Sequence, residues 1–202
     1  MISLEQTVAV LLCAGLSQRY GAGNKLLASI GGKPLAMHAA ELCATLSFAS
    51  RIAVVPPAEP KLHALLSDVG FDLTVNPDPA SGKDSSLRLG LAAALDRGAG
   101  GALVLLGDMP HVTSAHLLAL SAAADEETAT ISAAETVQSP PTFMPAEAVR
   151  RAIAHDDRPV RACLGRLITV ATNKSQLADY DYAEQFSVAT AHAVRQMGKP
   201  FQ

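Results

Sequence analysis

The chain of 202 residues is poor in aromatic side chains and nearly balanced in charge. It has no Trp, three Tyr, five Phe and a formal net charge of -3 at pH 7. So few rings leave little on which the bases of a single strand could stack. No broad basic surface is available to attract nucleic acid through counterion release. We therefore expect no nucleic-acid partner, and any anion site must be local.

Cysteine is also scarce. Cys13, Cys43 and Cys163 lie far apart, and none belongs to a C-x-x-C pair. A disulfide framework or a structural zinc site is therefore not expected. Reduced thiols that lie partly or wholly in the core are the simpler interpretation.

Long apolar runs are missing as well. The apolar run from Val8 to Cys13 is too short for a signal peptide or a membrane span, and no basic segment precedes it. We expect a cytoplasmic protein without a membrane partner.

Short apolar runs alternate with segments of helical spacing along the whole chain. We predict strands over residues 8–13, 52–55, 71–75, 102–106, 129–133 and 167–171, and helices over 34–42, 62–69, 87–95, 114–120, 146–155 and 182–197. This alternation predicts one α/β domain over residues 1–202 with a mostly parallel sheet. The proline-containing stretch from Val137 to Pro145 is predicted to form a projecting hairpin.

The first candidate site is the glycine-rich segment from Leu11 to Leu27, directly after the first predicted strand. Its glycines would let backbone N–H groups approach phosphate oxygens, and Arg19 and Lys25 add two cations. The alternative is an ordinary glycine-rich turn with two solvated cations. Two familiar phosphate motifs are excluded: no G-x-G-x-x-G follows the first strand, and Gly82-Lys83 continues with Asp84 rather than Ser or Thr.

The second candidate is Asp108, which follows the predicted strand 102–106 in the sequence Gly107-Asp108-Met109-Pro110. A carboxylate at the end of a buried strand is well placed to hold Mg²⁺ against phosphates, because Mg²⁺ prefers hard oxygen ligands. The alternative is a turn that leads into the helix capped by Thr113 or Ser114.

These segments resemble a known family in their order along the chain. Residues 12–27 resemble the signature L-x-A-G-x-S-x-R-x-G-x-x-N-K-L-L of the MobA-like nucleotidyltransferases of the molybdenum cofactor. Residues 107–110 match that family's G-D-M-P. The stretch from Asn76 through Ser81-Gly82 to Ser86 and Gly90 is similar to its third block, and residues 179–184 are similar to a late D-I-D-T-P-E block.

The resemblance implies a Rossmann-like, three-layer nucleotidyltransferase fold and transfer of a nucleoside monophosphate from a nucleoside triphosphate, with release of pyrophosphate. It implies that Arg19 and Lys25 hold the β- and γ-phosphates, and that Asp108 and Asp181 ligate Mg²⁺. Asp181 could instead be a surface residue that caps the last helix. Lys83 could help to hold the phosphates, although an exposed loop lysine is the simpler interpretation. The residues implied to contact the nucleotide are Leu12, Ala14, Gly15, Ser17, Asn76, Ser81, Gly82 and Ser86.

Ala14-Gly15 together with Asn24-Lys25 is similar to the cytidylyl-transferring, MocA-like branch, whereas the guanylyl branch tends toward Gly-Gly and Asp-Lys. The resemblance thus favours CTP over GTP, molybdopterin as the acceptor, and a molybdenum hydroxylase apoenzyme as a partner. The chain departs from the family at Ser139-Pro140-Pro141, where G-x-P is usual, and over residues 155–161, where a glycine turn is usual.

Two alternatives remain open at this point. One is a cytidylyltransferase for a sugar or polyol phosphate such as 2-C-methyl-D-erythritol 4-phosphate. The other is a nucleotide- or cofactor-binding maturation factor for a molybdenum hydroxylase, without turnover.

Overall fold

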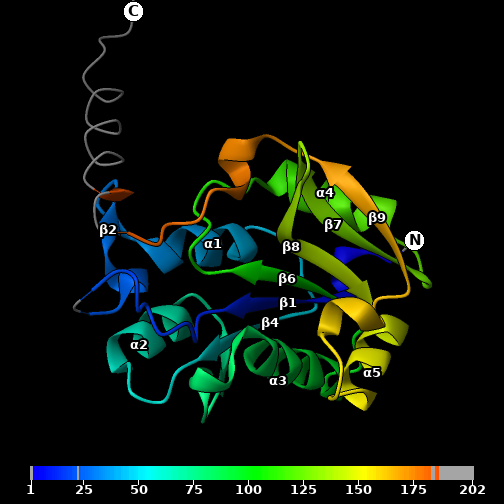
Figure 1. The fold of residues 1–202 in the computed structure, drawn as a ribbon, viewed down its shortest axis with the longest axis horizontal. Coiled ribbons are helices and arrows are strands. Elements are labelled where there is room, and N and C mark those ends of the chain that lie inside the picture. Colours follow the sequence, from blue (N-terminus) through cyan, green and yellow to red (C-terminus); the bar gives the residue numbers. More distant parts are fainter. Residues whose placement is uncertain (1, 22, 183–184, 187–202) are drawn as a thin grey trace, which may run out of the picture.

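A seven-stranded sheet runs through the middle of the computed structural model, which describes residues 2–21, 23–182 and 185–186 (Figure 1). The strand order is β5-β4-β1-β6-β8-β7-β9. The strands of this sheet are β1 (Thr7–Leu12), β4 (Ser50–Val55), β5 (Asp72–Val75), β6 (Gly101–Leu106), β7 (Thr128–Ala134), β8 (Val137–Pro145) and β9 (Arg166–Ala171), while β2 (Ser29–Ile30) and β3 (Lys33–Pro34) form a separate antiparallel pair.

Every neighbouring pair in this sheet is parallel except those made by β8, which is antiparallel to both β6 and β7. The central strand β1 pairs with β4 on one side and β6 on the other, and its residues from Thr7 to Leu11 are buried. A strand covered on both faces needs apolar side chains at successive positions. This explains why a continuous apolar run, rather than an alternating one, forms β1.

Helices cover both faces of the sheet and produce three layers (Figure 1). One core cluster contains residues of α1, α2 and α4 packed on Leu11, Ala53 and Leu103, and the other contains residues of α3 and α5 packed on Val10 and Val54. The helices are α1 (Leu35–Ala44), α2 (Pro60–Asp68), α3 (Lys83–Asp96), α4 (Ser114–Ala123) and α5 (Ala146–Ala154), joined by the short 3-10 helices η1 (Leu4–Gln6), η2 (Lys25–Leu27), η3 (Pro79–Ser81), η4 (Val160–Cys163) and η5 (Lys174–Leu177). The α/β, mostly parallel architecture is confirmed.

Helix α3 packs unusually close to the sheet at Gly90. A Cβ atom at this position would lie 2.5 Å from Val10 Cγ1 and 2.9 Å from Val54 Cγ2. Only glycine therefore permits this approach, which brings the first turn of α3 beside the carboxyl ends of β1 and β4.

The stretch from Val137 to Pro145 differs from the sequence prediction. It is the strand β8, inserted between β6 and β7, and not a hairpin that projects from the domain. The register of β7 against β8 shifts between Ile131 and Ser132, opposite the prolines. Proline cannot donate to a sheet ladder, so it is tolerated at such an irregularity. From the sequence alone, the two prolines indicate the end of a strand. The register shift that accommodates them lies in β7 and cannot be seen in residues 137–145.

The remaining sequence predictions concern the cysteines, the cap of α4, the last helix and membrane-spanning segments. All three cysteines are free and buried, and Thr113 caps α4 by accepting from the N–H of His116 over 3.3 Å. The helix predicted over residues 182–197 falls mainly outside the described residues. None of the described helices combines the length and apolarity that crossing a bilayer requires.

Candidate active site

A cavity of about 520 Å³ opens at the carboxyl ends of β1 and β6. Helix α1 follows β1 on one face of the sheet, whereas α3 precedes β6 on the other face. The strand order thus reverses direction at this point, and open α/β sheets bind ligands at such positions. The lining residues are Leu12, Ala14, Gly15, Leu16, Ser17, Gln18, Arg19, Lys25, Leu26, Pro79, Ala80, Gly82, Lys83, Ser86, Leu106, Asp108 and Asp181.

The loop after β1 folds back on itself and forms one wall of this cavity. Ser17 has a positive φ of 51°, and Gly21 and Gly23 both have φ near 99°, a region that favours glycine. Ser17 Oγ accepts from the backbone N–H of Lys25 over 3.1 Å, and Asn24 Oδ1 accepts from the first turn of η2. These contacts hold the two ends of the loop together, so that its cations lie near each other.

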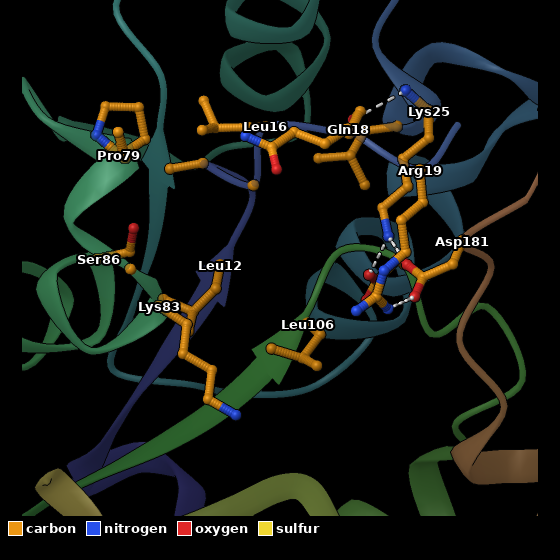
Figure 2. Close-up of a pocket in the computed structure, with 17 residues that line it drawn as sticks. Leu12, Leu16, Gln18, Arg19, Lys25, Pro79, Lys83, Ser86, Leu106 and Asp181 are labelled. Carbon is orange, nitrogen blue, oxygen red and sulfur yellow. Dashed lines mark hydrogen bonds and ion pairs between the residues drawn. The ribbon is translucent and has the colours of Figure 1, made fainter. Parts of the chain in front are cut away.

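Four charged side chains form a cluster on this wall (Figure 2). Lys25 Nζ donates to Asp108 Oδ2 over 2.7 Å and to Asp181 Oδ1 over 2.5 Å. Arg19 donates to Asp181 Oδ2 over 2.8 Å. Each side chain comes from a segment far from the others in sequence, except for the two cations. The cavity wall therefore carries balanced charges that are paired directly.

The pKa values in the cluster follow these contacts. Burial lowers the pKa of Lys25, but the charges and hydrogen bonds of Asp108 and Asp181 outweigh burial, so the pKa is raised. The hydrogen bond from Lys25 lowers the pKa of Asp181, and Arg19 acts in the same direction. Lys25 therefore stays protonated and Asp181 stays ionised at neutral pH.

One oxygen of Asp108 is buried and has no hydrogen-bond partner among the residues that the structure describes. This atom is Oδ1, while Oδ2 receives the Lys25 ammonium. A buried carboxylate oxygen without a donor is costly unless a cation or a donor reaches it. Together with the partly exposed Asp181 across Lys25, it offers hard oxygen ligands of the kind that Mg²⁺ and Mn²⁺ prefer. A divalent cation thus fits this pair of carboxylates.

No group of three or more His, Cys, Asp or Glu side chains with metal-binding spacing occurs within residues 2–21, 23–182 and 185–186. A site with few protein ligands suits a cation that keeps waters and also binds substrate phosphates. Two carboxylates alone would leave such a cation room for waters and phosphate oxygens.

Gly107 positions Asp108 closely against β1. A Cβ atom at Gly107 would lie 2.7 Å from Cys13 Sγ and 3.3 Å from the carbonyl oxygen of Leu12. The Gly107 N–H also donates to that oxygen over 3.0 Å. The turn after β6 therefore stays attached to the end of β1, which carries the loop.

The segment that brings Asp181 into the site is held by several contacts. The backbone N–H of Tyr180 donates to the carbonyl oxygen of Asp108 over 3.2 Å, and its hydroxyl lies 3.0 Å from His111 Nε2. The Tyr180 ring also packs edge-on against Phe186, which packs in the same way against Tyr20. We call the described residues from Tyr180 to Phe186 the C-terminal strap.

The opposite wall consists of η3 and the first turn of α3. Figure 2 shows Pro79, Lys83 and Ser86 there, across the cavity from Arg19 and Lys25. Ser86 is buried, and its Oγ accepts from Asn76 Nδ2 over 2.8 Å. Gly82 has φ of 104°, which glycine adopts without strain, and directly precedes α3 as its N-cap residue.

Most residues implied by the sequence converge here. Leu12, Ala14, Gly15, Ser17, Arg19, Lys25, Gly82, Ser86, Asp108 and Asp181 all line the cavity. Asn76 and Ser81 do not: Asn76 lies buried behind the wall, where it supports Ser86, and Ser81 Oγ donates to the carbonyl oxygen of Asp78.

Sequence reasoning missed some lining residues. Leu16, Gln18, Pro79, Ala80 and Leu106 are apolar or uncharged, and only their neighbours in the motifs could have indicated them. For Lys83, the sequence favours an exposed loop lysine over a contact with phosphate. Lys83 is exposed, but it begins α3 and faces the cavity, and no ion pair to it occurs in the described part of the chain.

Comparison with known proteins agrees with this geometry. The model of the MobA-like NTP transferase domain matches residues 9–182, which span both walls, Asp108 and Asp181. The chain belongs to the MobA-like NTP transferase family. It is therefore a nucleotidyltransferase, an enzyme whose substrate is a nucleoside triphosphate.

Solved structures show how widely this family fold is shared. Rv0371c of Mycobacterium tuberculosis in complex with manganese is 21% identical, with 92% of this chain and 98% of that chain covered and a TM-score of 0.73. The 4-diphosphocytidyl-2C-methyl-D-erythritol synthase of Anaerococcus prevotii is 13% identical, with 95% and 98% covered and a TM-score of 0.76.

Molybdopterin-guanine dinucleotide biosynthesis protein A of Archaeoglobus fulgidus is 17% identical, with 93% and 99% covered and a TM-score of 0.63. Among curated protein sequences, none matches this member of the MobA-like family. Identities this low establish the shared fold, while the specific substrates of the MobA-like chain have to be argued from its own residues.

Proposed function

We propose that this MobA-like enzyme transfers CMP from CTP to molybdopterin and releases pyrophosphate. The observation that carries the proposal is the charge cluster: two cations and two carboxylates line one wall of a cavity large enough for a nucleotide. Such a site favours the transfer of a charged phosphoryl group over covalent catalysis by a nucleophilic side chain.

In the proposed reaction, a phosphate oxygen of molybdopterin attacks the α-phosphorus of CTP. A new P–O bond forms on the α-phosphorus while its bond to the oxygen bridging to the β-phosphorus breaks. Negative charge then accumulates on the departing pyrophosphate. Arg19 and Lys25 are placed to stabilise this charge, because both cations project into the cavity from the loop after β1.

Asp108 and Asp181 are the residues that would hold Mg²⁺. Two features support this role: the buried Oδ1 of Asp108, which has no hydrogen-bond partner within the described ranges, and the partial exposure of Asp181. The structurally similar Rv0371c was solved in complex with manganese. The cation would neutralise phosphate oxygens and lower the cost of bringing two anions together. Lys25 lies between the two carboxylates and orients both of them toward the cavity.

The preference for CTP rests on the similarity of Ala14-Gly15 and Asn24-Lys25 to the cytidylyl-transferring branch. Within the cavity, Ala14 is buried with 1% of its surface exposed, and a Cβ at Gly15 would have no atom of the described residues within 4 Å. The lining beside Gly15 is thus open enough for a ribose or base to lie against the backbone.

The acceptor would enter from the side of β8. Thr142 of β8 pairs with Val104 of β6, so the chain just before Thr142, including Ser139 and the two prolines, runs past the end of β6. Leu106 at that end lines the cavity. Residues 139–141, which depart from the family pattern, therefore lie beside the proposed entry of the acceptor. A change of sequence there would alter which acceptor binds.

The 4-diphosphocytidyl-2C-methyl-D-erythritol synthase fold supports one competing acceptor, a polyol phosphate. A single experiment distinguishes three possibilities: molybdopterin as the acceptor, the polyol phosphate as the acceptor, and a maturation factor that binds its ligand without turnover. The purified full chain is incubated with Mg²⁺, labelled CTP or GTP, and either molybdopterin or 2-C-methyl-D-erythritol 4-phosphate, and pyrophosphate release is measured.

Release with CTP and molybdopterin alone would support the proposal. Release only with the polyol phosphate would mean that this compound, and not molybdopterin, is the acceptor. Release only with GTP would mean that GTP, and not CTP, is the nucleotide. Tight nucleotide binding without turnover for either acceptor would instead indicate a maturation factor that binds its ligand, including one that serves a molybdenum hydroxylase apoenzyme.

A further inference from the structure

Lys83 brings a positive charge to the wall of the cavity that faces Arg19 and Lys25. It is exposed, and within the described ranges its amine has neither an ion pair nor a hydrogen bond to another side chain. Figure 2 shows its side chain extending from α3 toward the side of the cavity on which Leu106 lies, away from Pro79. The three N–H donors of this amine are therefore available to a ligand.

Contacts among α3, η4 and β8 place Lys83 on the side from which the acceptor would enter. Asp84, its neighbour in the first turn of α3, accepts from the backbone N–H of Val160 in η4 over 3.1 Å. Arg161 of η4 donates in turn to the side-chain oxygen of Gln138 in β8. The start of α3 is thus joined through η4 to the strand beside which the acceptor would enter.

The other cations of this region are used elsewhere. Arg88, one turn further along α3, donates to the carbonyl oxygen of Arg158, and the Arg158 side chain pairs with Asp157 over 3.7 Å. In the part of the chain that the structure describes, the cavity lining includes Lys83 but none of the arginines at positions 88, 158 and 161. On the acceptor side, Lys83 is therefore the cation that a ligand in the cavity would meet.

The geometry of the proposed transfer gives the two walls different substrates. In the proposed reaction, Arg19 and Lys25 stabilise the departing pyrophosphate. The attacking and leaving oxygens of such a transfer lie roughly in line, on opposite sides of the phosphorus. The attacking oxygen therefore has to approach from the wall that faces the two cations, which is the wall of Lys83. A positive charge there would offset the repulsion between the acceptor's phosphate and the triphosphate.

We propose that Lys83 binds the phosphate group of the acceptor and holds its oxygen opposite the departing pyrophosphate. The inference rests on the proposed transfer of a nucleoside monophosphate to an acceptor that carries a phosphate. It goes beyond that proposal, because it assigns a residue to the acceptor's phosphate. Molybdopterin and 2-C-methyl-D-erythritol 4-phosphate both carry a phosphate monoester, so the role of Lys83 is the same for either acceptor.

The first test separates the two substrates kinetically. Lys83→Gln removes the charge and keeps much of the side-chain length. The KM values for CTP and for the acceptor are determined from pyrophosphate release in Mg²⁺, with whichever acceptor the wild type uses. We expect the KM for the acceptor to rise about 10- to 100-fold and the KM for CTP to change by less than about twofold. Lys83→Arg keeps the charge and should recover most of the loss.

Lys61→Gln is the matched control. Lys61 is also an exposed lysine in the first turn of a helix, α2, but it does not line the cavity. Its removal changes the net charge of the protein by the same amount, so both KM values should equal those of the wild type. Melting temperatures of all the variants check that each protein is folded.

A second measurement needs neither turnover nor a chosen acceptor. Inorganic phosphate is titrated into the full chain saturated with Mg²⁺ and the α,β-methylene analogue of CTP or of GTP, in which the bridge to the β-phosphorus cannot be cleaved. Titration calorimetry gives the dissociation constant of phosphate. We expect saturable binding to the wild type and to the Lys61 control, and binding at least about tenfold weaker to Lys83→Gln.

Weaker phosphate binding together with a selective rise in the KM for the acceptor would support the inference. It would be overturned by phosphate binding that is absent in the wild type or unchanged in Lys83→Gln, or by an unchanged KM for the acceptor. An equal rise in the KM for CTP would also overturn it, since Lys83 would then contact the nucleotide. If the wild type releases no pyrophosphate with either acceptor, the proposed function fails, and the phosphate titration still decides the role of Lys83.

Discussion

The backbone N–H of Tyr180 donates to the carbonyl oxygen of Asp108 over 3.2 Å. This bond joins the strap that carries Asp181 to the turn that carries Asp108, so the two acidic residues reach Lys25 from the end and from the middle of the family domain. The site is thus assembled by backbone pairing as well as by charge.

Asp108→Asn should reduce metal-dependent turnover by at least about 100-fold while the protein stays folded. The amide keeps the shape of the side chain but removes the anionic charge at the buried Oδ1. Pyrophosphate release and the thermal melting curve are the measurements. Asp96→Asn on the exposed end of α3 is the control and should have wild-type rates; full activity of the Asp108 variant would rule out its metal role.

Gly90→Ala should destabilise the protein by about 1–3 kcal/mol, because the new methyl group overpacks the core under α3. Its Cβ would lie 2.5 Å from Val10 Cγ1. Gly15→Ala is the comparison, since nothing lies within 4 Å of a Cβ there. Urea unfolding should show a loss only for the Gly90 variant, and adding Val10→Ala should recover part of it. Equal stability of both variants would contradict the close packing of α3.

Thiol reagents should modify the buried Cys13 and Cys43 slowly in the folded protein. Burial raises the pKa of the Cys43 thiol to about 12, and burial together with the Asp108 charge raises the pKa of Cys13. The reactive thiolate is therefore scarce at both positions at pH 8. We expect three thiols to react promptly in denaturant, and Cys13 and Cys43 to react at least about 100-fold more slowly in the native state. Peptide mass spectrometry assigns each modified residue, and fast native labelling of Cys13 or Cys43 is the contrary result.

The contribution of Asp181 to stability should be insensitive to pH until the solution is acidic. Hydrogen bonds from Lys25 and Arg19 lower the pKa of this carboxyl from its usual 3.8. A lowered pKa in the folded state adds stability above the unfolded-state pKa, and this stability is lost as the pH falls through the lower folded-state value. The stability difference between wild type and Asp181→Asn should therefore stay constant from pH 7 to about pH 4 and shrink only below that.

Melting temperatures of the two proteins over a pH series give this difference directly. The Asp179→Asn protein, which loses the same charge at an exposed position two residues away, should track the wild type throughout the series. A difference that already declines between pH 6 and pH 5 would mean that Asp181 is not held by Lys25 and Arg19.

Much of the fold could be predicted from local pattern. The strands β1, β4, β5, β6, β7 and β9 and the helices from α1 to α5 lie where apolar runs and helical spacing indicated, because buried parallel strands and amphipathic helices leave a periodic record in the chain. The short strands β2 and β3 were not predicted. Strand β8 was missed, since its two prolines resemble a break and its place in the sheet depends on the register shift in β7.

The sequence by itself determined the family, the α/β architecture and the residue types of the loop after β1, since these depend on contiguous motifs such as residues 12–27. Only the tertiary structure decided that Lys25 is bonded to both Asp108 and Asp181, and that Asn76 supports the wall behind Ser86 instead of lining the cavity. Spacing along a chain carries no distance between segments that fold together from far apart. The charge balance of the site is therefore a property of the folded molecule.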